Sequence, residues 1–403
     1  MPSPAIDSEG SATEPTTHIR ATTRAPAPVR IALLGAGTVG SAFLQRLDAL
    51  AGSPLTQRLQ LVHVANSRVS CCPSPIGRGW RGAPGEGVRA DWISSILESL
   101  DATRIGQSKG PLVRQSDGSN GDAAAALGDH GPRVLIDATA SEDVANRHAH
   151  WLASGIHVVT ACKLGQGTSL ARWKAIRAAG ARGRTTYGDA ATVGAGLPLL
   201  RSLRELRAGG ERIHAIAGVL SGSLAWLCNH YDGMRPFSAL VRQARQAGYT
   251  EPDPREDLSG EDVRRKLLIL ARAAGFELES GAVAVDSLVP PLLHKAHKDD
   301  VDDLLPLLDA PLRERFAQAY KRGEKLRFIA RLQRDDDGVP RARVGLESLP
   351  AEHPLASGAG TDNRVAIWSD RYREQPLLIQ GPGAGAEVTA AALLDDVLRI
   401  VGA

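Results

Sequence analysis

The chain has 403 residues, with 48 lysines and arginines against 45 aspartates and glutamates, and a formal net charge of +3. Its length suffices for about two to three domains, and its contents of 43% hydrophobic and 23% charged residues exclude a wholly disordered or fibrous protein. The small net charge gives no broad field for nucleic acid or anionic lipid, and no apolar run is long enough for a membrane span or a signal peptide. We therefore expect an enzyme of small-molecule chemistry, with no nucleic-acid or membrane partner.

Cysteine usage and the N-terminal composition bear on the cellular compartment. The four cysteines lack zinc-site spacing and are too few for a disulfide framework, which indicates a reducing compartment and a cytoplasmic location. Residues 1–28 are rich in Ser, Thr, Pro and Ala without apolar periodicity, so we expect a disordered tail. A transit peptide is the alternative, but Asp7, Glu9 and Glu14 lie among only two arginines in this stretch.

From Val29 onward, predicted strands and helices alternate. The strands are expected at 29–34, 59–65, 133–139 and 157–160, with helices at 38–51 and in a segment that ends at Trp151. Residues 70–90 and 103–132 are rich in Gly, Pro and Ser and are predicted to be long loops, whereas 190–345 contains several amphipathic helical patterns. The alternation predicts an α/β fold with a parallel sheet and helical crossovers, which is the architecture of a doubly wound nucleotide-binding domain.

A glycine-rich turn joins the first strand to the first helix. Gly35, Gly37 and Gly40 form the pattern G-x-G-x-x-G, with Thr38 and Val39 between the last two glycines. In a dinucleotide-binding turn the first glycine allows the tight turn, the second lets the backbone approach a pyrophosphate, and the third lets the helix pack on the strand. An ordinary glycine-rich turn is the alternative, but the strand before it and the helix after it favour dinucleotide binding.

The end of the second strand bears on the choice of dinucleotide. An NAD site usually offers an aspartate or glutamate to the ribose there, and this chain has none. Arg68 can instead pair with a 2′-phosphate, so we expect NADP, with NAD also possible. The alternative is that Arg68 is a solvated loop cation.

Residues 251–262 carry six carboxylates, and a helix is predicted to follow them. Ser259 is predicted to be the N-cap, and Asp262 and Lys266 lie four residues apart on one helix face. A surface ion pair is the plain interpretation. The functional one is that a lysine with an adjacent carboxylate exchanges the hydroxyl proton of an alcohol, while Glu251 and Asp257 bind a substrate ammonium group.

These residues belong to a longer segment that resembles a known family. Residues 248–266, which begin Gly-Tyr-Thr-Glu-Pro-Asp-Pro, are similar to the signature of homoserine dehydrogenases, with a departure at Glu256, where aspartate is more usual. The sequence Thr-Ala-Cys-Lys at 160–163 and the segments 192–198, 218–223 and 381–390 also resemble the family. The arrangement is most similar to the dehydrogenase half of bifunctional aspartokinase-homoserine dehydrogenases.

The resemblance implies a reaction and a set of site residues. The reaction is the reversible NAD(P)-dependent interconversion of L-homoserine and L-aspartate 4-semialdehyde, on the route to threonine and methionine. Lys266 would donate the proton, Asp262 would assist it, and Lys163 would lie near nicotinamide and substrate, although Lys163 can also be read as a strand-end surface cation. Further cofactor contacts are implied at Thr139, Ala140, Lys163, Gly248 and Gly385. Backbone carbonyls would hold a monovalent cation such as sodium at Ala190, Val193, Ala195 and Leu197, although relatives often have a glutamate where Ala190 stands.

The resemblance also implies a domain organisation. Residues 29–190 would form an NADP-binding Rossmann domain completed by 383–403, and 191–382 an α+β catalytic and dimerisation region, in a homodimer or larger homo-oligomer. The chain stops after the last motif, so we expect no regulatory domain and no inhibition by threonine. Two alternatives stay open: an NADP-dependent reductase of another amino-acid aldehyde, and an inactive NADP-binding regulatory subunit. The retained Asp262, Lys266 and Lys163 argue against the latter.

Overall fold

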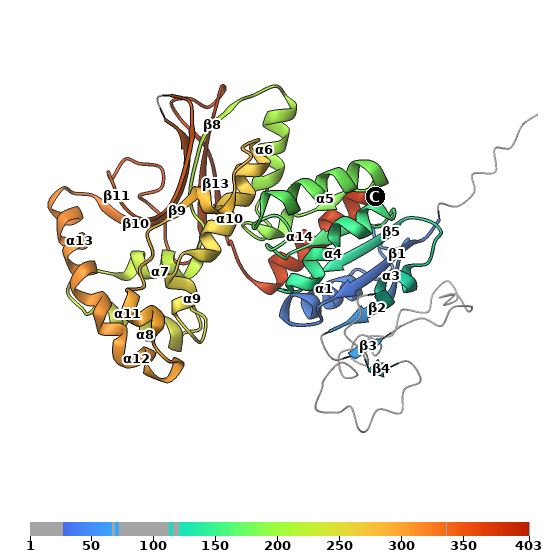
Figure 1. Ribbon diagram of the computed structural model, residues 1–403, viewed down its shortest axis with the longest axis horizontal. Coiled ribbons are helices and arrows are strands. Elements are labelled where there is room, and N and C mark those ends of the chain that lie inside the picture. Colours follow the sequence, from blue (N-terminus) through green and yellow to red (C-terminus); the bar gives the residue numbers. More distant parts are fainter. Residues whose placement is uncertain (1–26, 67–68, 72–112, 116–120, 336, 403) are drawn as a thin grey trace, which may run out of the picture.

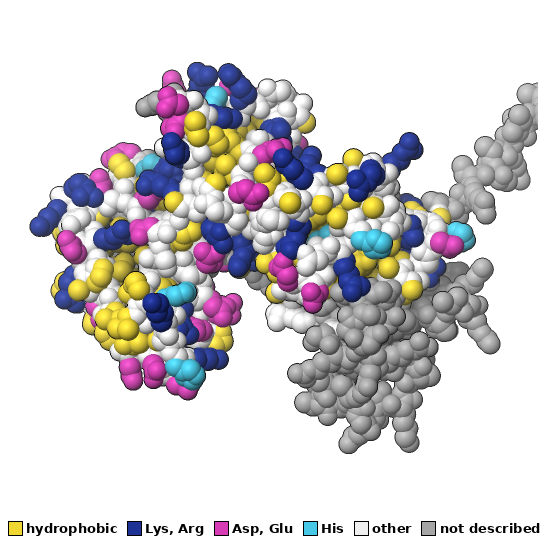
Figure 2. Space-filling model, in the orientation of Figure 1, with side chains coloured by type: hydrophobic (Ala, Val, Ile, Leu, Met, Phe, Trp, Pro, Cys, Tyr) yellow, Lys and Arg dark blue, Asp and Glu magenta, His cyan; other side chains and the backbone are white. Residues whose placement is uncertain are grey.

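The computed structural model describes residues 27–66, 69–71, 113–115, 121–335 and 337–402. Almost all of the predicted N-terminal tail, as well as Arg68, therefore lies outside the described residues. The described chain forms two lobes, each built on one sheet (Figure 1). No helix in these ranges is long and apolar enough to cross a membrane. On the face that Figure 2 shows, basic and acidic side chains are interspersed.

The first lobe contains a seven-stranded sheet with the strand order β4-β3-β2-β1-β5-β6-β7. The strands are β1 (Val29–Leu34), β2 (Leu59–Ala65), β3 (Val69–Cys71), β4 (Val113–Gln115), β5 (Arg133–Asp137), β6 (His157–Thr160) and β7 (Tyr187–Gly188). From β2 to β7 all pairings are parallel, as the sequence predicts. The prediction is wrong at the edge, where β3 and β4 pair antiparallel.

Helices cover both faces of this sheet, which makes it doubly wound. Ile31 and Leu33 of β1 face α1 (Thr38–Ala49) and α14 (Ala386–Val401), whereas Ala32 and Leu34 face the opposite layer. That layer consists of α3 (Gly121–Leu127), α4 (Glu142–Ala153) and α5 (Leu170–Gly183). Strand β4 and helix α3 lie within the predicted loop 103–132, so that prediction is wrong there. The alanine run within α3 is a good helix former that its glycine-rich surroundings obscure.

The second lobe contains a six-stranded mixed sheet with the order β13-β12-β8-β10-β11-β9. Its strands are β8 (Ile213–Val219), β9 (Val283–Val285), β10 (Lys325–Arg334), β11 (Pro340–Leu349), β12 (Asn363–Ser369) and β13 (Leu377–Gly381). The helices of this lobe are α6 (Leu199–Ala208), α7 (Gly222–His230), α8 (Phe237–Gln246), α9 (Arg255–Leu258), α10 (Glu261–Ala273), α11 (Pro291–Lys295), α12 (Val301–Leu304) and α13 (Asp309–Lys321). They pack against the sheet around the largest hydrophobic core of the described chain.

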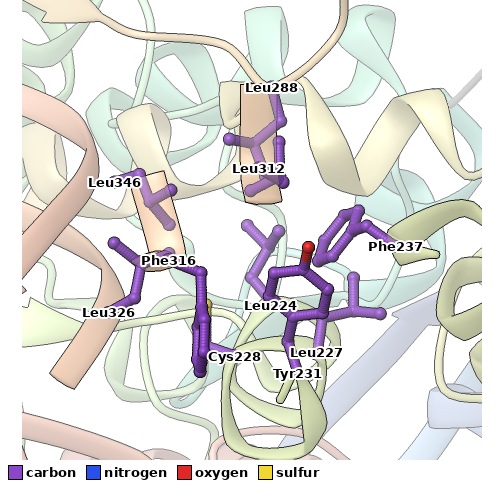
Figure 3. Close-up of a pocket in the computed structure, with 10 residues that line it drawn as sticks. All are labelled: Leu224, Leu227, Cys228, Tyr231, Phe237, Leu288, Leu312, Phe316, Leu326 and Leu346. Atoms are coloured by element: carbon purple, nitrogen blue, oxygen red, sulfur yellow. The ribbon is translucent and has the colours of Figure 1, made fainter. Parts of the chain in front are cut away.

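Within this core, side chains from α7, α13 and the sheet surround a small apolar cavity (Figure 3). The Tyr231 hydroxyl at its wall has no hydrogen-bond partner in the described part of the chain. Burial raises the pKa of the Cys228 thiol at the same wall to about 11, so this cysteine stays protonated and unreactive. The cavity is therefore a feature of packing rather than of chemistry.

The chain crosses between the lobes twice. It leaves the first sheet after β7 through a 3-10 turn at Ala190–Thr192, and it returns from β13 to α14. Helix α14 packs on α1, as Figure 1 shows, with Ala390, Leu393 and Val397 fully buried. The last helix of the sequence is therefore part of the first lobe.

Candidate active site

The three glycines of the turn between β1 and α1 differ in how much room each leaves for a β-carbon. Gly35 has φ +92°, and a β-carbon there would lie 2.7 Å from the carbonyl of Ala138, at the end of β5. A β-carbon on Gly40 would lie 1.9 Å from the carbonyl oxygen of Gly35. A β-carbon on Gly37, the N-cap of α1, would meet nothing within 4 Å, and this residue makes no side-chain cap. Open space and free amides thus meet at the helix N-terminus, which suits a pyrophosphate.

The turn lies at the switch point of the sheet, because β1 is flanked by β2 on one side and by β5 on the other. Ligands of such sheets bind at the carboxyl ends of the strands at this point. Thr139 and Ala140, both predicted to contact the cofactor, lie two and three residues after the end of β5. Strand β2 ends at Ala65, shortly before Arg68.

A buried hydrogen-bond network, which the sequence analysis missed, fixes the end of β5. The fully buried Asp137 accepts hydrogen bonds from the backbone N–H and the hydroxyl of Thr139, at 2.9 and 2.6 Å. Its other carboxylate oxygen lies 2.9 Å from Nε2 of His148, and Nδ1 of His148 lies 2.9 Å from the Tyr187 hydroxyl. An aspartate that ends an apolar strand was the signal in the sequence. The network holds Thr139 in place beside the glycine turn.

Helix α10, which carries Asp262 and Lys266, starts later than the sequence predicts. Ser259 follows α9, and the N-cap of α10 is Gly260, with φ +76°. A β-carbon on Gly260 would lie 2.9 Å from the ring of Phe328 in β10, so only glycine fits there. The Ser259 hydroxyl still accepts a hydrogen bond from the N–H of Glu261 at 3.2 Å. The predicted N-cap is therefore wrong by one residue.

Asp262 joins two lysines from different lobes. Its carboxylate lies 2.9 Å from Nζ of Lys266 and 3.3 Å from Nζ of Lys163. Lys266 is buried, and its Nζ also donates to the Leu220 carbonyl at 2.8 Å. Burial alone would raise the pKa of Asp262, but the two ammonium groups hold that pKa well below its ordinary value. This arrangement differs from a solvent-exposed surface pair.

Lys163 reaches Asp262 because its loop docks on α10. The loop is closed by a hydrogen bond of 2.7 Å from the N–H of Gly167 to the Lys163 carbonyl. A β-carbon on Gly167 would lie 3.1 Å from Arg265 of α10, so the loop packs tightly on the helix. Arg272, nearly fully buried near the end of α10, donates to the carbonyls of Gln166, Thr168 and Leu278. Nothing in the sequence indicates this clamp, because its partners are backbone carbonyls.

Residues 251–262, the acidic segment, are fixed in part by hydrogen bonds to the carboxylate of Asp257. Asp257 accepts a hydrogen bond from the N–H of Glu251 at 2.8 Å and from the Ser223 hydroxyl at 2.6 Å. The exposed Glu251 carboxylate has no partner in the part of the chain that the structure describes. Gly248 lies just after α8 with φ +75°, and a β-carbon there would meet nothing within 4 Å. The Glu251 carboxylate is therefore free for a ligand.

The loop from Ala190 to Leu197 is the predicted cation site. Gly194 and Ala195 have φ of +72° and +49°, a conformation that turns successive carbonyls in different directions. Ala190 supplies no carboxylate, and its N–H donates to Asp396 at 2.9 Å. The neighbouring Asp189 cannot substitute, because Arg204 and a glutamine engage both of its oxygens. Within the described residues, no group of three His, Cys, Asp or Glu could hold a metal. The oxygen donors that the loop itself offers are its backbone carbonyls.

Gly385, the last predicted cofactor residue, is the N-cap of α14, with φ +129°. Its carbonyl accepts hydrogen bonds from the N–H and the hydroxyl of Thr389, at 3.1 and 2.7 Å. A β-carbon on Gly196 would lie 3.4 Å from the Val388 carbonyl, so the start of α14 lies against the loop 190–197.

Comparison with known proteins identifies the family. The family model for homoserine dehydrogenase matches residues 198–398, and that for the NAD binding domain of homoserine dehydrogenase matches residues 35–187. A homoserine dehydrogenase of Saccharomyces cerevisiae is 35% identical over 379 residues, which cover 92% of this chain and 98% of the yeast protein. A bifunctional aspartokinase/homoserine dehydrogenase of Zea mays is 43% identical over 270 residues, 66% of this chain, but the match spans only 29% of the maize protein.

Solved structures share the fold of this chain. A crystal structure of a Candida auris protein of unknown function has a TM-score of 0.77 and 31% identity, and the match covers 93% of this chain and 98% of that one. A hyperthermophilic archaeal homoserine dehydrogenase in complex with NADPH shares the fold at a TM-score of 0.65 and 18% identity, with 93% of this chain and 98% of that chain covered. Because the match to the yeast enzyme is long and spans nearly both proteins, this chain belongs to the homoserine dehydrogenase family of oxidoreductases.

Proposed function

We propose that this protein interconverts L-homoserine and L-aspartate 4-semialdehyde with a nicotinamide dinucleotide. The observation that carries the proposal is the pairing of Asp262 with two lysines, one from each lobe. A lysine of the nucleotide-binding lobe and a lysine of the second lobe thereby meet where cofactor and substrate would have to meet. A simple dinucleotide-binding module has no need of such a group.

The chain's own residues account for the proton transfer. The nicotinamide ring supplies a hydride in the reducing direction and accepts one in the oxidising direction. The Lys266 ammonium has three hydrogens, of which one faces the Leu220 carbonyl and one faces Asp262. The third is available to donate to the aldehyde oxygen as the alcohol forms, and in reverse the neutral amine takes the hydroxyl proton. Asp262 orients Lys266 through their contact of 2.9 Å.

Acidic and basic side chains are proposed to hold the substrate. The free Glu251 carboxylate, with Asp257 beside it, binds the α-ammonium group of homoserine. Lys163, whose side chain is one-third exposed, offers a cation near both the nicotinamide and the substrate. Gly35, Gly37 and Gly40 provide the pyrophosphate cradle, with Thr38, Val39, Thr139, Ala140, Gly248 and Gly385 as further proposed contacts.

The test is an absorbance assay of purified protein with L-homoserine and either NADP or NAD. We expect homoserine-dependent reduction of the cofactor. Turnover of a different amino alcohol instead would identify a related reductase, and cofactor binding without any turnover would identify an inactive regulatory subunit.

Finer proposals concern the cofactor, the cation, the assembly, the cellular location and the domain organisation. We propose NADP over NAD because Arg68 follows β2 and no carboxylate does. The carbonyls of loop 190–197 are proposed to bind a monovalent cation such as sodium, which activity assays in different chloride salts would test.

We propose a homodimer or larger homo-oligomer in the cytoplasm, testable by sedimentation and by cell fractionation. Residues 29–190 with 383–403 are proposed to form the cofactor domain, and 191–382 the catalytic and dimerisation region.

A further inference from the structure

One short segment of the second lobe supports both parts of the proposed active site. Residues 220–223 comprise the two-residue connection after β8 and the first two residues of α7. The carbonyl of Leu220 accepts a hydrogen bond from Nζ of Lys266 at 2.8 Å. Three residues later, the hydroxyl of Ser223 donates to Oδ1 of Asp257 at 2.6 Å. The segment therefore contacts the proton-transferring lysine through its backbone and the acidic segment through a side chain.

The hydroxyl of Ser223 is part of a directed chain of hydrogen bonds. Ser221 and Ser223 are both buried, and their Oγ atoms lie 2.9 Å apart. Each hydroxyl has one hydrogen, and that of Ser223 is given to Asp257, so Ser221 donates to Ser223. The Oγ of Ser221 in turn accepts from the N–H of Leu224 at 3.2 Å, as the N-cap of α7. Such a chain polarises each bond in the same direction and strengthens the last one.

The other oxygen of Asp257 holds Glu251 by its backbone. Oδ2 of Asp257 accepts from the N–H of Glu251 at 2.8 Å, while the Glu251 side chain itself is exposed. Glu251 lies between α8 and α9 in the loop 247–254, which belongs to neither a helix nor a strand. Asp257 therefore orients the free carboxylate only as long as its own orientation is fixed. The Ser223 hydroxyl fixes it.

We propose that Ser223, supported by Ser221, is a positioning residue that determines how tightly the protein binds the ammonium group of its substrate. It acts through Asp257 on the backbone of Glu251, without touching the substrate. The inference rests on the proposed function, because it assigns a substrate to Glu251. Lys266 is held separately, through the Leu220 carbonyl and Asp262, so loss of the Ser223 hydroxyl affects substrate affinity more than the chemical step.

The test is Ser223→Ala, with KM and kcat measured for homoserine and the dissociation constant measured for NADPH. We expect KM for homoserine to rise about tenfold, the effect of a lost hydrogen bond to a charged group, with kcat changed less than about threefold. NADPH binding should be unchanged, which also shows that the variant is folded. Ser221→Ala should raise KM in the same direction but less, and it serves as the test if Ser223→Ala does not fold.

Ser238→Ala is the matched control. Ser238 is a buried serine whose hydroxyl donates to the Asp309 carboxylate at 3.0 Å, away from the proposed active site. Its loss removes the same kind of bond, so we expect a lower Tm with an unchanged KM. An equal rise of KM in Ser238→Ala would mean that the effect of Ser223 is merely structural, and would overturn the inference.

A double-mutant cycle tests whether Ser223 acts through Asp257. If it does, Ser223→Ala should add nothing to the KM of Asp257→Ala. Additive effects, or an unchanged KM in a folded Ser223→Ala or Ser221→Ala variant, would overturn the inference. Wild-type protein that does not turn over homoserine would instead overturn the proposed function, so the two failures are distinguishable.

Discussion

Replacement of Lys266 by alanine tests the proton-transfer step directly. The substitution removes the hydrogen bond to the Leu220 carbonyl and the ion pair of 2.9 Å with Asp262. If Lys266 donates the substrate proton, turnover should fall by roughly 10² to 10⁴, the usual contribution of a positioned acid or base. That range corresponds to about 3 to 5 kcal/mol on the activation barrier. Cofactor affinity should stay nearly intact.

The structure also indicates how much stability the variant should lose. Removal of one partner from a buried ion pair costs about 3 to 5 kcal/mol when the other charge is left alone. Asp262 is not left alone, because Nζ of Lys163 lies 3.3 Å from it. We therefore expect a loss nearer about 1 to 3 kcal/mol, which leaves the protein folded. Asp262→Asn should slow turnover as well, because it removes the charge that orients Lys266.

The assay combines three measurements on Lys266→Ala. Steady-state absorbance gives kcat and KM, fluorescence titration gives NADPH affinity, and urea unfolding gives stability. A small primary amine added to the variant should restore part of the rate if the missing group is a proton donor. The reasoning is refuted if the variant keeps full turnover, or if its turnover is lost only together with its fold. In the first case Lys163 becomes the leading proton donor.

Three further predictions concern the cofactor site and the pH dependence of stability. Gly37→Ala should leave Tm unchanged but weaken NADPH binding at least about tenfold, because the added β-carbon meets only the space that a pyrophosphate would occupy. Gly40→Ala should weaken binding and also lower Tm, because its β-carbon would collide with the Gly35 carbonyl. Equal Tm values for the two variants would contradict this account. Arg68→Ala should reduce the preference for NADP over NAD, and an unchanged ratio of the two dissociation constants would exclude the proposed role. Burial raises the pKa of Asp396 from 3.8 to about 6, with a further contribution from Asp189, so the folded protein retains a proton that the unfolded chain releases and stability falls as pH rises through that interval. The loss amounts to at most about 3 kcal/mol, and in urea unfolding it should be smaller in Asp396→Asn than in wild type.

The local parts of the fold and the site could be predicted because their signals lie within a few residues. The apolar run Val29–Leu34, the spacing of Gly35, Gly37 and Gly40, and the four-residue spacing of Asp262 and Lys266 each depend on backbone geometry that neighbouring residues dictate. The resemblance of residues 248–266 to a family signature then indicated the reaction. None of these inferences required knowledge of which segments meet in space.

The boundaries and the contacts were decided by tertiary structure. Ser259 satisfies the local rule for an N-cap, yet the N-cap of α10 is Gly260. The positive φ at this position and the close approach of Phe328 leave room for glycine alone. Helix α14 belongs to the first lobe because its apolar face packs on α1 and on strands of the first sheet, all of which are distant from it in sequence.

The same holds for the groups around the proposed site. A lysine, an aspartate and a serine are common surface residues, and nothing in the sequence near Lys163 or Ser223 indicates its partner. Lys163 meets Asp262 only because its loop docks on α10, and Ser223 meets Asp257 only because α7 starts beside the acidic segment. Sequence determined which chemical groups this protein has and which local elements carry them. Tertiary structure decided which groups touch, because a contact between distant segments depends on how whole helices and sheets pack together.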